Sequence, residues 1–191
     1  MLRQVRFGIA ASCALLASVA TVATPSARSG QLFDETRVRA QAVVSSSPLV
    51  RGTLVRAAVE IRVGRGFHVN ANPASEDFLI ATAVSVQAAG VEVVQVFYPD
   101  PLERTFGFWP EALKVWEGNV VAGVILRVTD AVALGDTNLR FLVDYQACND
   151  EACFAPAQVT AGVPVVVAAA GTPAREIASP LLDKARFSED S

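Results

Sequence analysis

The sequence of 191 residues has little histidine, cysteine or charge, and each shortage argues against a class of function. Its one histidine, His68, has no serine nucleophile in a glycine-flanked turn to work with, so serine hydrolase chemistry is not expected. A net charge of −3 provides no basic face for nucleic acid. No glycine-rich loop that would hold a phosphate group is present. We therefore expect no cofactor and no nucleic-acid partner.

Metal ligands are also scarce. A structural zinc site takes four ligands and a catalytic site takes three. Of the three cysteines, Cys13 lies in an apolar N-terminal segment, which leaves Cys148, Cys153 and His68 without the spacing of a zinc motif. A metal site is therefore not expected, and His68 is predicted to be an ordinary packed or exposed loop histidine.

The segment Met1–Ala23 is typical of a secretory signal peptide. Arg3 and Arg6 precede an apolar stretch that ends in the small residues of a cleavage site. A membrane anchor is the alternative, but the stretch is shorter than the about 20 apolar residues of a span. An acylated Cys13 is disfavoured by the poor lipobox before it. We expect a periplasmic protein with no stable membrane insertion after cleavage.

Beyond the signal peptide, the composition suits one domain with a tail at each end. Hydrophobic residues make up 52% of the chain and charged residues 18%, which is ample material for a core. We expect a flexible linker over residues 24–34, a folded domain over 35–170 and a C-terminal tail over 171–191. The tail is predicted to hold a short helix or none, because Pro180 interrupts it.

Apolar residues alternate with polar ones along most of the predicted domain, which is typical of half-buried strands. The clearest run joins Val55 to Val63, with Arg56, Glu60 and Arg62 expected to face solvent. Eight or nine short strands are expected, separated by turn residues. This pattern predicts an all-β protein, specifically an antiparallel β-sandwich.

Two connections follow from the turn residues. Strands over residues 80–86 and 91–98 meet at Gly90 and are expected to form a hairpin. Residues 99–110 are expected to form a long irregular loop. From the residues alone, its aromatic side chains are expected either to fold back onto the core or to serve a site; they are Phe106, Phe108 and Trp109.

The stretch around Cys148 and Cys153 organises the rest of the chain. Alternating apolar residues predict one strand that ends at Tyr145 and a returning strand after Pro156. Between them, residues 149–152 are polar and form turns readily. We therefore predict a β-hairpin with one cysteine at each end of its tip. Opposed residues in a non-hydrogen-bonded site have Cα atoms about 4.5 Å apart, which is near the short end of disulfide geometry.

An exported chain without Cys13 keeps an even pair of cysteines, so a Cys148–Cys153 disulfide is expected. The residues alone leave open whether it is redox-active or structural. A ring this small gains little stability by constraining the unfolded chain. The spacing is nevertheless wider than that of thioredoxin-type pairs. Asp150 and Glu151 in the tip would oppose thiolate formation.

Three sequence blocks, in order along the chain, carry a family resemblance. They are Gly66–Pro73 followed by Phe78–Ile80, then Tyr98-Pro99 followed by Val115–Gly118, and finally Tyr145–Cys148 followed by Cys153 and Pro156. Together they resemble the N-terminal periplasmic domain of the DsbD thiol:disulfide interchange proteins. The chain departs from that family at Ala157, where many relatives have a second proline. The membrane-spanning and thioredoxin-like domains of full-length DsbD are also absent from this sequence.

The resemblance implies an immunoglobulin-like sandwich with a working cysteine pair. Cys153 would exchange with the partner, and Cys148 would be the resolving thiol. Tyr145 would lie beside the site, although its place in the alternating run is as consistent with core packing. An aromatic cap loop would cover the pair and open for partners, and its candidate residues are Phe106, Phe108 and Trp109.

The expected function is a periplasmic carrier of electrons by thiol–disulfide exchange. The resemblance implies thioredoxin-like periplasmic partners and a membrane-embedded thiol reductant that acts in trans. The alternative is an exported binding or assembly module, in which the disulfide only braces the hairpin.

Overall fold

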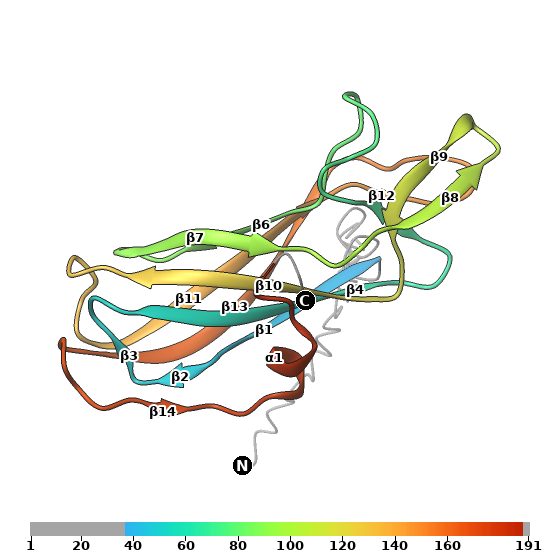
Figure 1. The fold of residues 1–191 in the computed structure, drawn as a ribbon. Helices are drawn as coiled ribbons and strands as arrows, with labels where there is room; N and C mark the ends of the chain where they lie inside the picture. The colour runs from blue at the N-terminus through green and yellow to red at the C-terminus, as the bar shows by residue number, and fades with distance from the viewer. Residues whose placement is uncertain (1–36, 189–191) are drawn as a thin grey trace, which may run out of the picture.

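The computed structural model describes residues 37–188, so the predicted signal peptide and linker lie outside the described residues. Two four-stranded sheets make up most of the described fold (Figure 1). In spatial order, the first contains β1 (Val38–Val44), β4 (Leu54–Val63), β10 (Asn119–Val128) and β7 (Val91–Phe97). The second contains β3 (Leu49–Val50), β13 (Ala157–Ala168), β11 (Gly135–Tyr145) and β6 (Ala83–Gln87). Neighbouring strands are antiparallel, apart from the parallel pair β13 and β3.

The core lies between these two sheets. Side chains alternate along each strand, so β4 and β10 turn one face toward β11 and β13. The buried set forms one cluster that includes Val59, Ile61, Leu126, Leu139 and Phe141. The predicted fold class, an all-β antiparallel sandwich, is therefore confirmed, and its immunoglobulin-like character stays what the family resemblance implies.

A third sheet lies at one end of the sandwich and carries the cysteine hairpin (Figure 1). Its strands, in spatial order, are β12 (Ala147–Cys148), β5 (His68–Asn70), β9 (Trp109–Trp116) and β8 (Leu102–Phe106). The predicted irregular loop over residues 99–110 is therefore wrong, because most of it is a β-hairpin in which Phe106 pairs with Trp109. Proline and glycine had suggested a break, but only Gly107 and Phe108 lie between the two strands.

The predicted hairpin over residues 80–98 is also wrong. β6 begins only at Ala83 and pairs with β11, whereas β7 pairs with β10 in the other sheet. The chain crosses between the sheets at Gly90, where φ is +75°. A Cβ atom on this residue would lie 2.3 Å from the backbone nitrogen of Val132, so the crossing requires glycine. Alternation of apolar and polar residues identifies a strand, but it does not show which other strand pairs with it.

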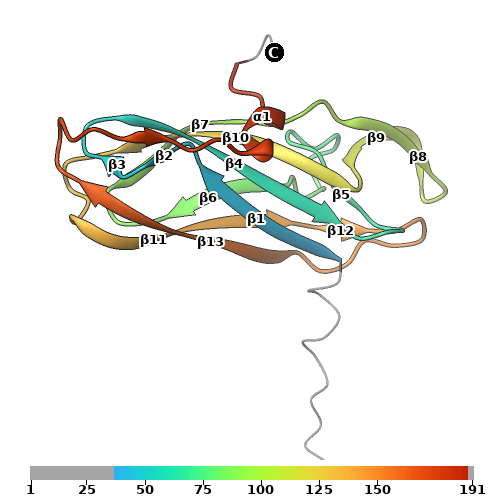
Figure 2. The same cartoon turned by 90° about the horizontal axis from the view of Figure 1, so that it is seen from below.

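Glu60 was predicted to face solvent, but its side chain is buried. It accepts hydrogen bonds from Gln41 Nε2 at 2.8 Å and from Arg62 Nε at 2.5 Å. The outer face of the first sheet is covered at its centre by the C-terminal segment, whose helix α1 (Pro180–Lys184) packs against β4 (Figure 2). Alternation identified the face that points away from the core, but that face is not solvated everywhere.

The C-terminal segment begins with β14 (Arg175–Glu176), which pairs with β2 (Ser46–Ser47). Pro180 does not interrupt the helix as predicted, because it occupies the first turn, where its missing N–H costs nothing. Ser179 is the N-cap and accepts a hydrogen bond from the backbone N–H of Leu181. Within residues 37–188, no helix has the length and apolar character needed to cross a membrane.

Candidate functional site

The cysteine hairpin has the geometry that the sequence predicts. β11 and β13 pair along their length, and beyond them Cys148 forms an antiparallel bridge with Cys153. The flanking backbone bonds run from Asn149 N to Ala152 O and from Phe154 N to Ala147 O, so the cysteines occupy a non-hydrogen-bonded site. Their Cα atoms are 4.0 Å apart, and a disulfide joins them. The predicted disulfide is thus present in the structure.

The side chain of Asn149 closes the tip. Its Oδ1 accepts hydrogen bonds from the backbone N–H groups of Glu151 at 3.0 Å and Ala152 at 2.8 Å. This arrangement holds the tip in its turn and keeps the two cysteines in register.

We expect Asn149→Ala to lower the free energy of unfolding of the oxidised protein by about 1 kcal/mol, because both N–H groups lose a partner in an exposed loop. Urea unfolding measures the change. Asn119→Ala is the matched control, since that amide is exposed at the start of β10, away from the tip. Equal losses in the two variants would contradict a role for Asn149 in holding the tip.

The two cysteines differ in exposure. Cys148 is 1% exposed, whereas Cys153 is exposed to solvent. Cys153 lies in a groove of about 280 Å³ whose other lining side chains are mostly apolar, and they include Phe78, Leu79, Phe108, Trp109 and Leu113. An incoming protein therefore meets Cys153 first, with Cys148 behind it.

The β8–β9 hairpin brings the three aromatic candidates to the cysteine end in two different places. Phe108 and Trp109 line the groove with Cys153, and Trp109 lies 5.0 Å from Phe78 between ring centroids. Phe106 stacks on His68 at 4.2 Å and on Phe108 at 5.4 Å. All three residues lie outside the core cluster, so the packing alternative does not describe them. Their role as a cap stays a prediction.

The other predicted site residues also lie in different places, one in the core and two on the hairpin tip. Tyr145 is 2% exposed and belongs to the core cluster, so it packs beneath the hairpin. Asp150 and Glu151 are exposed on the tip. Glu151 lines the Cys153 groove, whereas Asp150 lines a second pocket on the His68 side.

Three residues at the site were not predicted from the sequence. Phe78 is 61% exposed at the groove, opposite Trp109. Gln146 ties the hairpin to the segment before β6, because its Nε2 donates to Phe154 O at 3.1 Å and its Oε1 accepts from Ile80 N at 3.5 Å. His68 is the third. In the sequence it follows a glycine turn and lies in the Gly66–Pro73 block, but neither signal shows which residue it contacts.

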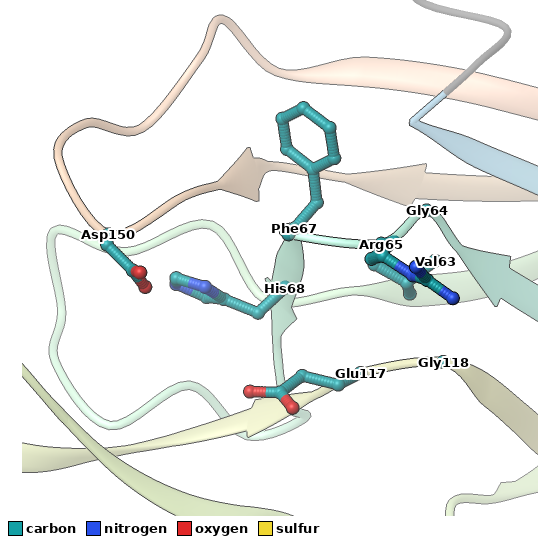
Figure 3. Close-up of a pocket in the computed structure, with 9 residues that line it drawn as sticks. Val63, Gly64, Arg65, Phe67, His68, Glu117, Gly118 and Asp150 are labelled. Atoms are coloured by element: carbon teal, nitrogen blue, oxygen red, sulfur yellow. The ribbon is translucent and has the colours of Figure 1, made fainter.

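His68 lies directly beside the disulfide. β5 pairs with β12 so that His68 opposes Cys148. The His68 side chain is buried, and its Nε2 has no hydrogen-bond partner among residues 37–188. It lines a pocket of about 420 Å³ in which its ring points toward Asp150 and the Glu117 carboxylate lies to one side (Figure 3). Burial lowers the pKa of His68 from 6.5, and the Glu117 and Asp150 carboxylates oppose that shift.

This shift predicts a pH dependence of stability. The unfolded chain binds a proton on His68 near pH 6.5, before the folded protein does, because the folded-state pKa is lower. The free energy of unfolding should therefore fall as pH drops below 6.5 and level off once the folded imidazole is protonated. The charged groups that line the same pocket are Arg65, Glu117 and Asp150.

Urea unfolding of the wild type and of His68→Gln between about pH 5.5 and 8 measures this contribution, because carboxylates titrate mainly below that range. The wild type should lose stability toward the acidic end, and the variant should lose less. Parallel curves for the two proteins would contradict a buried, neutral His68.

Among the described residues, 37–188, no three His, Cys, Asp or Glu side chains come close enough together to hold a metal ion. The site holds a disulfide between an exposed cysteine and a buried one, and His68 opposes the buried cysteine. Such a pair can exchange through the exposed member.

No family model matches the sequence, and no curated protein matches it. Among solved structures, the N-terminal periplasmic domain of ScsB from Proteus mirabilis is similar at 13% identity and a TM-score of 0.45, covering 65% of this chain and 46% of that one. The chain thus spans less than half of that structure's length.

Two further structures are similar at lower TM-scores. The seventh ScaB type I cohesin from Pseudobacteroides cellulosolvens has 14% identity and a TM-score of 0.34, with 70% of this chain and 95% of that chain covered. AggA, the major subunit of aggregative adherence fimbriae type I from Escherichia coli, has 12% identity and a TM-score of 0.29, with 68% and 95% covered. These are likenesses between remote structures, and they carry no conclusion about function.

Proposed function

We propose that the protein is an exported thiol–disulfide exchange protein that carries electrons through Cys148 and Cys153 to oxidised partner proteins. One observation carries the proposal: Cys153 is exposed in an aromatic-lined groove, while its disulfide partner Cys148 is buried. A disulfide that only stabilises the hairpin does not need an exposed cysteine. The resemblance of the cysteine block to the DsbD N-terminal domain supports the same function.

The exchange has two steps. In the reduced protein, the Cys153 thiolate attacks one sulfur of the partner disulfide, forms a mixed disulfide and releases the partner's other sulfur as a thiolate. The Cys148 thiolate then attacks the Cys153 sulfur, which closes the Cys148–Cys153 bond and releases the second partner thiolate. The partner gains two electrons and two protons, and this protein is oxidised.

We further propose that the partners are thioredoxin-like periplasmic proteins and that a membrane-embedded thiol reductant restores the dithiol. The hairpin tip supports docking of a compact partner, because Cys153 is exposed and β12, which holds its disulfide partner Cys148, lies at one end of the sandwich (Figure 1). A thioredoxin-like active site also exposes a cysteine.

The test is a two-protein exchange. The reduced protein is mixed with an oxidised thioredoxin-fold protein, the reaction is quenched with acid, and free thiols are alkylated and counted by mass. We expect two thiols to disappear from this protein as two appear on the partner. Unchanged thiol counts in both proteins at the end of the incubation would overturn the proposal.

The competing proposal is an exported binding module with a purely structural disulfide. One observation favours it: Cys148 is almost fully buried, as a bracing half-cystine would be. The reverse assay decides: the oxidised protein is mixed with a reduced thioredoxin-fold protein. A carrier disulfide is opened by this exchange, whereas a bracing disulfide resists reduction and stays closed.

Export is part of the proposed function and rests on the N-terminal sequence. Mass spectrometry of protein recovered from the extracytoplasmic fraction should show a chain that begins near Thr24, since the predicted cleavage follows Ala23. An intact chain that starts at Met1 and stays in the cytoplasm would contradict both the location and the oxidising environment assumed for the cysteines.

A further inference from the structure

His68 lies in a row of polar and sulfur-bearing side chains that crosses the third sheet. Cys148 opposes Cys153 on one side and His68 on the other. Opposed residues in antiparallel strands project to the same face, with Cβ atoms about 4.5–5.5 Å apart. The side chains of His68 and Cys148 therefore start from neighbouring positions on the same face of the sheet.

The same register extends the row to Glu117. β5 and β9 pair Val69 with Trp116, so one step along the two strands brings His68 opposite Glu117. Val69, Trp116 and Ala147 are buried in the core cluster, which places the core on the alternate face. Figure 3 agrees, because the Glu117 carboxylate and the His68 ring lie in the same pocket.

One feature of His68 is unexplained by packing. Its Nε2 is buried and has no hydrogen-bond partner in the described part of the chain, which is unfavourable for a buried polar group. Phe106 covers one face of the ring at 4.2 Å between centroids, and this contact holds the ring in place. Opening the disulfide would provide the missing partner, because a free Cys148 thiol can donate to an imidazole nitrogen.

The buried position of Cys148 creates a need for such a base. Apolar surroundings raise the pKa of a thiol, yet only the thiolate attacks a disulfide. Cys148 is 1% exposed, so solvent has little access to its proton. The chain has one histidine in all, and it is the residue that opposes Cys148.

We propose that His68 is the proton acceptor for Cys148 in the resolving step of disulfide exchange, with Glu117 and Asp150 beside the imidazolium. This inference rests on the proposed function and adds a residue to it. The imidazole takes the proton from the Cys148 thiol, and the resulting thiolate attacks the Cys153 sulfur of the mixed disulfide. The Cys148–Cys153 bond forms, the bond from Cys153 to the partner breaks, and the partner thiolate leaves with the electron pair.

The proton then moves outward through the pocket. The carboxylates of Glu117 and Asp150 line the same space as the imidazole, and they stabilise its charged form while it exists. From the pocket the proton passes to solvent or to the departing thiolate. In the reverse direction, the imidazolium returns the proton to the Cys148 sulfur as the disulfide is opened.

The test separates the two exchange steps with a small aromatic disulfide, dithiobis(nitrobenzoate), whose thiolate is coloured. Attack by Cys153 on the reagent releases the first nitrothiobenzoate in a second-order step. Attack by Cys148 on the mixed disulfide releases the second in a first-order step. Stopped-flow absorbance follows both releases on the reduced full chain.

We expect His68→Gln to slow the second release at least about tenfold near pH 7, because an unassisted thiol is only a few per cent ionised there. The first release should stay at the wild-type rate. Raising the pH should restore the second release in the variant, since Cys148 then ionises without a base. Arg65→Gln is the matched control, because Arg65 lines the same pocket on a neighbouring turn.

A second readout needs no substitution. In the wild type, the rate of the second release should have its inflection below pH 6.5, where the buried imidazole titrates, rather than near the about 8.5 of a free thiol. A second release that is equally fast in His68→Gln and in wild type overturns the role of His68, as does equal slowing of both steps. Both outcomes leave the carrier function standing. Absence of the first release overturns the carrier function, and the role of His68 with it.

Discussion

The Cys148→Ser variant should accumulate a mixed disulfide with a thioredoxin-like partner, whereas Cys153→Ser should accumulate almost none. Cys153 is exposed in its groove, so in Cys148→Ser it still attacks the partner, and no resolving thiol remains to release it. In Cys153→Ser the remaining thiol is 1% exposed and cannot meet a partner sulfur. Non-reducing electrophoresis and intact mass detect the covalent complex.

Stability separates this outcome from a structural role. The disulfide joins residues five apart, so its loss should lower the free energy of unfolding by only about 2 kcal/mol on the chain-entropy relation. Both variants should therefore remain folded in the assay. Equal trapping by the two variants, or none by either, would contradict the assignment of Cys153 as the exchanging cysteine.

Replacement of Phe108 and Trp109 by alanine should speed the reaction of Cys153 with small reagents. Phe108 and Trp109 line the groove that holds this cysteine, and Phe108 is 40% exposed, so truncation removes cover without opening the core. We expect the reduced Phe108→Ala/Trp109→Ala protein to be alkylated by iodoacetamide about tenfold faster, which corresponds to about 1.4 kcal/mol of lost shielding. Mass spectrometry of quenched samples measures the rate.

Leu134→Ala is the matched control for this variant, because Leu134 is 54% exposed in the turn before β11 and lines no groove with Cys153. Its alkylation rate should equal that of the wild type. An unchanged rate in the double variant would remove the cap interpretation, and loss of folding would mean that the two rings support the β8–β9 hairpin instead.

Much of the fold follows from local pattern. The run from Val55 to Val63 and the strand that ends at Tyr145 were predicted from alternating apolar residues, and the structure has β4 and β11 there. The cysteine hairpin was predictable because both of its strands and its turn lie within one continuous stretch. In such a hairpin the neighbour of each strand is known from the chain itself.

The errors concern relations between distant segments. Alternation assigned Glu60 to the outer face, but it could not show that the C-terminal segment covers that face. It identified the strands on either side of Gly90, but not that they belong to different sheets. Residues 99–110 contain Pro99 and Pro101 before β8 and Pro110 outside the paired positions of β8 and β9, so their pairing was hidden by composition.

The candidate site shows the same contrast between residues close in sequence, which were predicted, and a distant residue, which was not. Cys148, Cys153 and the three aromatic residues were named as site candidates, because the cysteines lie close in sequence and the family resemblance linked them to an aromatic segment. That this segment is a hairpin was not predicted. His68 was not predicted as part of the site. It lies 80 positions before Cys148, and only the pairing of β5 with β12 brings the two together.

The reduction potential of the Cys148–Cys153 pair tests the carrier function most directly. It is measured by equilibrating the protein with glutathione or dithiothreitol buffers of known potential and counting free thiols by alkylation. An electron carrier should have a potential above about −300 mV, within reach of thioredoxin-like partners. A potential below about −300 mV would place this bond among structural disulfides that resist reduction, and would contradict the carrier function.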